Sequence, residues 1–411
     1  MYNSAFSAIS LRGELKSKDF QAARKEDLNA WLVDQVQKAV EISVDGFEAC
    51  MSLRQEFRKG KAVWVVESLP QQLVIRKISN NIRRLTWVKQ ASRDIIVGDL
   101  IGFLKSDINY RIYKLDIQSF YESVSPEILI SRLYRDTSVS RSTARLVKSF
   151  FCELSNKRIV GLPRGISLSA TLSELFIRDF DAAVLASEKV FFYNRYVDDL
   201  IVITDGTENP KDFVSWLGDK LPGELKFNDC KTDIGCILRQ PKKNDFGKIR
   251  HCFNFLGYEL TIKNPAQEHC ARGVLVDICE SKSKRIKTKI ALSLLSFNKN
   301  SNFELLDMRI RYLTSNYAIY DPDQDRIRMA GIFYNYKRVN VEDRLRELDL
   351  YFKAMLLGGG GKLSAGIMEL ITREQRRKLL SYSFCRGFAS RIKYHFSSAD
   401  YRSIKRCWVN V

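Results

Sequence analysis

Histidine is scarce in this sequence, and cysteine occurs without the spacing that metal sites use. There are three histidines and nine cysteines among 411 residues, and no two cysteines form a C-x-x-C pair. A structural zinc site therefore has little support, and the adjacent His251 and Cys252 lack further ligands. Scattered cysteines in an odd number are typical of reduced thiols, which favours the cytoplasm.

Long apolar runs are also missing. The longest, such as residues 200–203, are far too short to cross a bilayer. The N-terminus shows no basic start followed by a long apolar stretch, which would indicate a signal peptide. We therefore expect a cytoplasmic protein that has no membrane partner.

The charge balance is strongly basic. Lysine and arginine number 67 against 48 acidic residues, which gives a net charge of +19 and a pI near 9.5. Such an excess attracts polyanions over long range. A solvated basic surface would show the same balance, so charge alone favours nucleic acid only moderately. Membrane binding is the weaker alternative, because no single amphipathic basic helix carries the excess.

The length predicts two or three domains, and the patterns divide the chain. Residues 1–60 show helical spacing of apolar residues, and residues 61–115 mix short strands with a basic stretch. Strands alternate with helices from 110 to 262, and periodic helical segments follow. The glycine run 358–361 predicts a flexible hinge loop.

The central segment predicts an antiparallel sheet with helices on one face. Residues 110–117 alternate as a strand, and Ser125 followed by Pro126 is typical of a helix N-terminus. Two apolar runs within residues 190–203 meet at Asp198-Asp199 and predict a hairpin. Strands near Leu225 and Phe255 are expected to complete the sheet.

The sequence Tyr196-Val197-Asp198-Asp199 is the most informative in the chain. Two adjacent carboxylates in an apolar hairpin repel each other and are costly to remove from water. Divalent cations account for such a pair, because Mg²⁺ prefers carboxylate oxygens and keeps positions open for phosphates. A solvent-exposed acidic turn is the alternative that this tetrapeptide leaves open.

A third carboxylate lies at the end of the strand at 110–117. Asp116 precedes an aromatic pair and a capped helix. If its strand lies beside the hairpin, three carboxylates converge at one sheet edge, which is enough to hold two metal ions for displacement at a phosphate. By itself Asp116 would be an ordinary acid before a helix.

In order and spacing, these segments resemble the motifs of reverse transcriptases over roughly residues 75–260. Asp116 with Tyr121 resembles motif A, and Tyr196 to Asp199 resembles the Y-x-D-D box of motif C. The remaining similarities are Leu162-Pro163-Arg164-Gly165 to motif B, Asn228-Asp229-Cys230-Lys231-Thr232 to motif D, and Phe255-Leu256-Gly257-Tyr258 to the primer grip.

The resemblance implies roles at the reacting centre. Asp116, Asp198 and Asp199 would bind two Mg²⁺ ions, with the main-chain carbonyl of Ile117 assisting. Lys231 would protonate or neutralise pyrophosphate, and is expected to be catalytic together with the three aspartates.

The same resemblance implies a deoxynucleotide site and a primer grip. Tyr121 would exclude a 2′-hydroxyl by contact, and Gly165 would let the backbone approach the nucleotide. The expected nucleotide-binding residues are Arg83, Arg84, Tyr121, Arg164 and Gly165, and the expected primer-grip residues are Leu256, Gly257 and Tyr258. For Arg83 and Arg84 a plain surface role is an equal alternative.

One residue of motif B departs from the pattern that is usual in reverse transcriptases. Motif B usually carries glutamine where this chain has Arg164. The start of the following helix, residues 166–174, is together with the stretch 76–93 and the helical C-terminal third most similar to bacterial defence-associated and abortive-infection reverse transcriptases, including the first polymerase of type 3 defence systems. The expected partners are deoxynucleotides, a noncoding RNA template, its DNA product, and a second reverse transcriptase or a second copy of the chain.

The sequence thus predicts an α+β right-hand polymerase. We expect an N-terminal helical segment at 1–60, fingers at 61–115, a ferredoxin-like palm at 116–262, and an all-helical thumb and accessory region at 263–411. The predicted activity is RNA-directed DNA synthesis in antiphage defence. The alternatives are a catalytically silent RNA-binding scaffold, an RNA-synthesising polymerase, and the reverse transcriptase of a mobile element.

Overall fold

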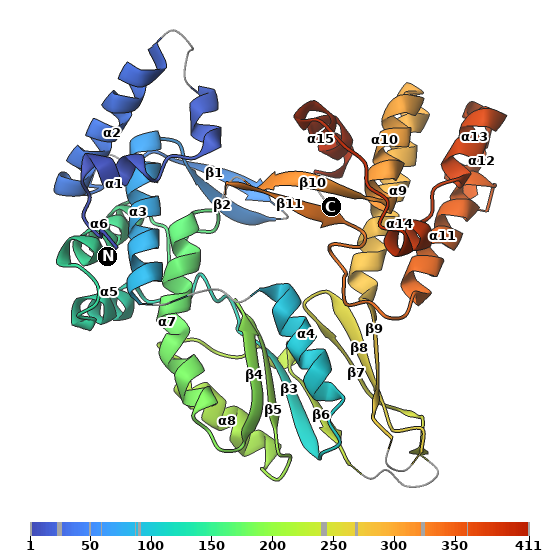
Figure 1. The fold of residues 1–411 in the computed structure, drawn as a ribbon, viewed down its shortest axis with the longest axis horizontal. Helices are drawn as coiled ribbons and strands as arrows, with labels where there is room; N and C mark the ends of the chain where they lie inside the picture. Colours follow the sequence, from blue (N-terminus) through green and yellow to red (C-terminus); the bar gives the residue numbers. More distant parts are fainter. Residues whose placement is uncertain are drawn as a thin grey trace. The chain divides into compact units, whose positions relative to one another are not determined.

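The computed structural model describes residues 2–22, 27–48, 51–58, 60–86, 88, 92–239, 245–267, 270–321, 325–359 and 361–409. The chain divides into two compact units (Figure 1). The first contains 1–92, 109–237 and 322–325, and the second contains 93–108, 238–321 and 326–411. No helix within the described ranges is both long and apolar enough to cross a bilayer. The four expected functional ranges stay predictions, because compactness alone does not define fingers, palm and thumb.

The first unit begins with helices that surround a long central one. That central helix, α3 (Leu69–Leu85), starts with Pro70 in its first turn, where a missing N–H is harmless. Its apolar side chains are buried, Leu73, Ile78 and Ile82 among them. The other helices here are α1 (Ala8–Arg12), η1 (Ser17–Ala22), α2 (Leu28–Asp45), α5 (Pro126–Arg135) and α6 (Arg141–Asn156).

A hairpin interrupts the segment that was expected to be helical throughout. Strand β1 (Leu53–Arg58) pairs antiparallel with β2 (Lys61–Val66). The expectation of helix up to residue 60 is therefore wrong for 53–58. The physical reason is the partner strand, whose Val63-Trp64-Val65 run favours extended backbone and offers a ladder for the polar β1.

The palm sheet has four antiparallel strands in the order β4-β5-β3-β6. They are β3 (Tyr110–Asp116), β4 (Val190–Tyr196), β5 (Asp199–Thr204) and β6 (Asp233–Ile237). The predicted hairpin and the strand at 110–117 are confirmed, and β5 pairs with both β4 and β3. The fourth strand is β6, whereas Phe227 near Leu225 forms only an isolated bridge with Ile117.

Helices cover one face of this sheet (Figure 1). Tyr113 and Tyr193 both lie opposite Val202, so they share a face. Tyr113 contacts Phe213 of α8 (Pro210–Lys220), and Tyr193 contacts Phe180 of α7 (Ser167–Leu185). The predicted helix at Ser125-Pro126 is also confirmed, because the Ser125 hydroxyl accepts the N–H of Ile128.

The second unit contains a separate sheet of three antiparallel strands, β7 (Ile249–Phe255), β8 (Tyr258–Lys263) and β9 (Gly273–Ile278). Phe255 therefore lies outside the palm sheet, and the expectation that its strand completes that sheet is wrong. Helix α4 (Arg93–Leu104) belongs to this unit, where Gly98 faces the guanidinium of Arg338 so closely that a Cβ would meet it at 2.8 Å.

The C-terminal region is mostly but not entirely helical. Strand β10 (Asn316–Asp321) pairs with β11 (Arg326–Gly331), and β9 also lies beyond residue 263. The all-helical expectation fails here because Tyr317, Ile319 and Tyr320 favour extended backbone. The helices are α9 (Glu280–Asn300), α10 (Phe303–Thr314), α11 (Asp343–Leu356), α12 (Gly361–Leu370), α13 (Arg373–Leu380), α14 (Phe384–Ala389), α15 (Ser398–Lys405) and η5 (Arg406–Trp408).

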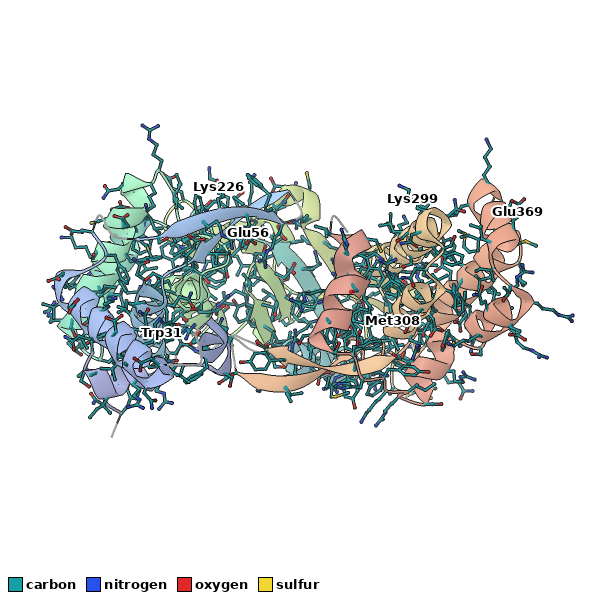
Figure 2. The ribbon with its side chains drawn as sticks, turned by 90° about the horizontal axis from the view of Figure 1, so that it is seen from above. Trp31, Glu56, Lys226, Lys299, Met308 and Glu369 are labelled. Carbon is teal, nitrogen blue, oxygen red and sulfur yellow. The ribbon has the colours of Figure 1, made fainter. Side chains whose placement is uncertain are left out.

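These helices enclose a second hydrophobic core. Its buried residues include Ile290, Leu294 and Phe352, and Met308 packs against them (Figure 2). The glycine run at 358–361 joins α11 to α12, but Gly360 lies outside the described residues. The hinge that was expected there stays a prediction.

Candidate active site

Three aspartates meet where β3 ends beside the β4–β5 hairpin. Asp116 lies opposite Asp199 in the register of β3 and β5. Directly opposed residues place their Cβ atoms about 4.5–5.5 Å apart. The main-chain N–H of Ile117 donates to the carbonyl of Asp198 at 2.9 Å, so the third aspartate is tied to the same edge. The convergence that the sequence predicted is present in the backbone.

The hairpin turn consists of Val197 and Asp198, because Tyr196 pairs with Asp199. The tip is thus one residue earlier than expected, and Asp199 is the first residue of β5. Val197 has a φ of 60°, a left-handed conformation that is strained for a β-branched residue. Its carbonyl accepts a hydrogen bond of 3.0 Å from Arg195, which holds the turn in this form.

Arg195 is buried and connects the hairpin to helix α7. Its guanidinium donates to Glu174 at 2.6 Å and to Asp181 at 2.7 Å. The hydroxyl of Tyr193 also donates to Asp181, at 2.5 Å. Arg195 therefore holds Glu174, Asp181 and the carbonyl of Val197 directly, and it holds the hydroxyl of Tyr193 through Asp181. No local pattern indicated this role for Arg195 beyond its place two positions before the turn.

Lys231 lies against the first aspartate. Its ammonium contacts both carboxylate oxygens of Asp116 at 3.0 Å. The short helix η3 (Asp229–Lys231) places it there, and the N–H of Asn228 donates to the main-chain carbonyl of Asp116 at 2.8 Å. The hydrogen bond to Asp116 raises the pKa of Lys231 and keeps it charged. The structure thus brings the predicted motif D lysine to the aspartates.

The carboxylates carry more negative charge than their surroundings neutralise. Burial, together with the neighbouring Asp198, raises the pKa of Asp199 to about 6. Burial and the proximity of Asp116 likewise raise the pKa of Asp198. The upward shifts show that burial and mutual repulsion outweigh the nearby Lys231, which acts to lower both pKa values.

This donor set suits a hard divalent cation. Carboxylate oxygens are the ligands that Mg²⁺ takes, and a bound cation would relieve the repulsion that raises both pKa values. As the side chains stand, however, no group of three acidic, histidine or cysteine side chains in the described ranges is arranged to hold an ion. Lys231 occupies both oxygens of Asp116, so metal binding there requires this ammonium to move away.

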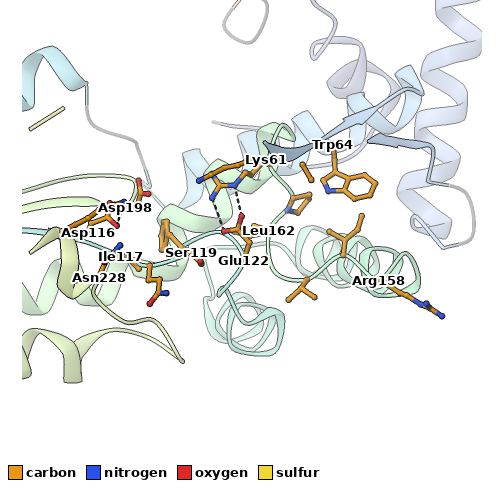
Figure 3. Close-up of a pocket in the computed structure, with 18 residues that line it drawn as sticks. Lys61, Trp64, Asp116, Ile117, Ser119, Glu122, Arg158, Leu162, Asp198 and Asn228 are labelled. Atoms are coloured by element: carbon orange, nitrogen blue, oxygen red, sulfur yellow. Dashed lines mark hydrogen bonds and ion pairs between the residues drawn. The ribbon is translucent and has the colours of Figure 1, made fainter. Parts of the chain in front are cut away.

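A cavity of about 640 Å³ opens beside the aspartates (Figure 3). Asp116, Asp198 and Lys231 line one part of it, and Lys61 and Trp64 of the β1–β2 hairpin line another. Sequence analysis missed Lys61 and Trp64, because their link to the aspartates exists only in three dimensions. Arg158, Glu122 and Asn228 are further lining residues that were missed.

Arg164 is also in the cavity wall, and its contacts involve Tyr121. Its guanidinium forms two hydrogen bonds to the carboxylate of Glu122, at 2.9 and 3.1 Å, marked as dashed lines in Figure 3. It also lies 5.1 Å over the ring of Tyr121. Among the described residues that line the cavity, Tyr121 itself is absent. The predicted sugar-contacting residue therefore contacts the cavity wall through Arg164.

The backbone of Gly165 lies against strand β2, whereas the sequence predicted that a nucleotide would approach it. Its φ is 96°, and an added Cβ would lie 2.5 Å from Val63 and 2.6 Å from the carbonyl oxygen of Trp64. In this structure glycine is thus required by strand β2. A close approach of a nucleotide to the same backbone stays a prediction.

The basic residues of α3 do not reach this cavity. Arg83 and Arg84 are exposed, and the Arg84 guanidinium lies 4.8 Å over the ring of Tyr2. Arg76 is buried and pairs with Asp19, while Lys77 is buried and donates to the carbonyl of Asn3. Arg76 and Lys77 therefore serve packing within the first unit. Although Arg76 and Lys77 belong to the basic stretch of the sequence, neither adds to an exposed basic surface.

The predicted primer-grip residues form the turn between β7 and β8 in the second unit. Leu256 and Gly257 have positive φ values of 46° and 82°. Arg93 of α4 donates to the carbonyl of Leu256 at 2.7 Å and lies 4.9 Å over the ring of Tyr258. Arg93 thus supports the turn, a role that no local pattern indicated.

Comparisons with known proteins define the class. Residues 71–260 match the family model of reverse transcriptase (RNA-dependent DNA polymerase). This segment of the chain is therefore similar to a reverse transcriptase domain, the catalytic domain of RNA-directed DNA polymerases, which are nucleotidyltransferases. The match, together with the mixed helices and antiparallel sheets, confirms the predicted α+β right-hand polymerase fold.

Solved structures of fungal telomerases are among those similar to the chain, whereas no curated protein matches its sequence significantly. Apo telomerase from Candida tropicalis, truncated from its C-terminal domain, shares 15% identity over 65% of this chain and 51% of its own, with a TM-score of 0.33. Telomerase from Candida albicans with a telomeric RNA fragment shares 12% identity over 88% of this chain and 64% of its own, with a TM-score of 0.35. The chain thus spans between half and two thirds of the length of these proteins.

Proposed function

We propose that this chain synthesises DNA on an RNA template, with Asp116, Asp198 and Asp199 holding two Mg²⁺ ions. The observation that carries the proposal is the pairing of Asp116 with Asp199 across β3 and β5, with Asp198 bonded to Ile117 beside them. Three carboxylates at one sheet edge, two of them with raised pKa values, form a site that a divalent cation would neutralise.

The chain's own groups have separable roles in this proposal. The metal ions, when bound, lower the pKa of the primer hydroxyl and neutralise the leaving pyrophosphate. The aspartates and the Ile117 carbonyl orient these ions. Lys231 releases Asp116 and turns toward the pyrophosphate, where its charge and its proton are both useful. Lys61, in the same cavity, is placed to contact a phosphate of the nucleotide.

Counting bound metal ions tests this assignment. Titrating Mn²⁺ into the protein with a deoxynucleotide, followed by electron paramagnetic resonance, should give two bound ions per chain. Asp116→Ala and Asp198→Ala should each lose at least one ion. Asp219→Ala is the matched control, because Asp219 is exposed on α8 of the same domain. Equal metal counts in all four proteins would refute the assignment.

We further propose that the enzyme acts in antiphage defence with a dedicated noncoding RNA. The support is the motif B wording with Arg164, which resembles defence-associated enzymes, and the +19 charge, which a continuously bound RNA would offset. The test is to express the chain with its native flanking genes, challenge the cells with phages, and sequence the RNA that copurifies. Absence of both protection and a specific RNA would overturn the defence role and leave the polymerase assignment standing.

A further inference from the structure

The Arg164–Glu122 pair occupies an unusual place in the cavity wall. Both residues line the cavity that also contains Asp116 and Asp198. Neither is fully buried, with 28% of the Arg164 side chain and 50% of the Glu122 side chain exposed. A pair this exposed contributes little to folding. Its two-point geometry nevertheless fixes the plane of the guanidinium.

That plane lies over the ring of Tyr121. The ring also contacts Phe120, which packs edge-on at 5.9 Å. The main chain is held by a hydrogen bond from the N–H of Leu162 to the carbonyl of Tyr121, at 2.8 Å. Phe120, Leu162 and Arg164 all line the cavity, and of these three Arg164 is the one that places a charged group over the face of the ring.

The position of Arg164 is in turn fixed by the β1–β2 hairpin. The N–H of Trp64 donates to the main-chain carbonyl of Arg164 at 2.7 Å, and Gly165 leaves room for Val63. The main chain of Arg164 is thus bonded to β2, and its guanidinium is bonded to Glu122. It can hold Tyr121 in one orientation.

We propose that Arg164 and Glu122 are a positioning pair that holds Tyr121 in place and thereby sets the discrimination between deoxynucleotides and ribonucleotides. This rests on the proposed function, together with the sugar contact that the resemblance to reverse transcriptases implies for Tyr121. Exclusion by contact works only if the excluding group cannot yield, so a Tyr121 ring freed on its cavity side admits a 2′-hydroxyl more readily.

Direct binding of the triphosphate by Arg164 makes a different prediction. In that case Arg164→Gln would raise the KM for deoxynucleotides and ribonucleotides equally. Glu122→Gln would leave both KM values unchanged. The positioning role predicts that both variants raise kcat/KM for ribonucleotides relative to kcat/KM for deoxynucleotides.

The experiment measures single-nucleotide addition with deoxynucleotide and ribonucleotide on one primer–template. Because a cation over an aromatic ring is a modest interaction, Arg164→Gln should lower the discrimination about tenfold. Glu122→Gln should lower it by less, and Arg164→Lys should retain part of it. Arg158→Gln, which removes the same charge from the same cavity, should leave it unchanged.

The outcomes separate this inference from the proposed function. If Tyr121→Ala lowers the discrimination but Arg164→Gln and Glu122→Gln do not, the positioning role is wrong and the sugar contact stands. If Tyr121→Ala has no effect, the sugar contact itself is wrong. A fall with Arg158→Gln as large as that with Arg164→Gln would show a general effect of charge and would also overturn the positioning role. Thermal unfolding of each variant checks that the domain remains folded.

Discussion

Replacement of Arg195 by methionine would remove the cation that joins the catalytic hairpin to helix α7. Arg195 is 9% exposed, and its guanidinium contacts Glu174, Asp181 and the carbonyl of Val197. Breaking a buried ion pair by removing one partner costs about 3–5 kcal/mol, because the remaining charge stays buried without compensation. We expect a loss of this size in the free energy of unfolding.

The same change should also impair catalysis. The hydrogen bond from Arg195 stabilises the strained φ of Val197. When that bond is removed, we expect the turn to relax and Asp198 to move. A misplacement of about 1 Å at a reacting centre can reduce the rate by about 100-fold. Urea unfolding gives the stability, and single-turnover nucleotide addition at a temperature where the variant is folded gives the rate.

Arg111→Met provides the matched control. Arg111 pairs with the buried Glu208 and lies opposite Thr204, at the other end of β3 and β5 from the aspartates. It should cost a comparable amount of stability, about 3 kcal/mol, while the folded fraction keeps its rate. The reasoning is refuted if Arg195→Met loses less than about 1 kcal/mol, or if both variants lose the same fraction of activity.

Three further predictions follow from the site. Because the pKa of Asp199 is raised to about 6, the folded state binds its proton more tightly than the unfolded state does, and stability falls as pH rises from about 4 to 6. Without metal at pH 8, the free energy of unfolding of Asp199→Asn should therefore exceed that of the unmodified protein by about 1–3 kcal/mol. At pH 4 the two proteins should be equally stable. Equal urea midpoints at pH 8 would contradict this prediction. Gly165→Ala should lose about 1–3 kcal/mol, because its Cβ collides with Val63 and the Trp64 carbonyl at a φ of 96°; unchanged stability would show that β2 yields easily. Binding of nucleic acid should weaken steeply with salt, by roughly one logarithmic unit of slope per phosphate contact, and a salt-insensitive titration would indicate a protein partner instead.

Local signals predicted the elements that bear the aspartates. The alternation of residues 110–117 and the paired apolar runs at 190–203 correspond to β3 and the β4–β5 hairpin. The N-cap Ser125 and the first-turn Pro126 marked the start of α5. These succeeded because strand alternation and helix caps are properties of neighbouring residues. The register then brought Asp116 and Asp199 together.

Features that depend on distant partners were missed. Arg76 belongs to the basic stretch of the sequence, but it is buried against Asp19, more than fifty residues away in sequence. The polar strand β1 has no apolar alternation of its own and forms only because β2 pairs with it. Lys61, Glu122 and Arg93 gain their roles from contacts with other elements. Sequence patterns report local preference and exposure, and they do not report which partner a charge will find.

The central claim is that the aspartates at the end of β3 and in the β4–β5 hairpin catalyse DNA synthesis directed by RNA. The most direct test supplies the purified chain with a primed RNA of defined sequence, labelled deoxynucleotides and Mg²⁺, and sequences the product. We predict DNA complementary to the RNA from the unmodified protein and from Asp219→Ala, and none from Asp198→Ala or Asp116→Ala. Complementary DNA made by either of the last two variants, or no complementary DNA from the unmodified protein, would contradict the claim.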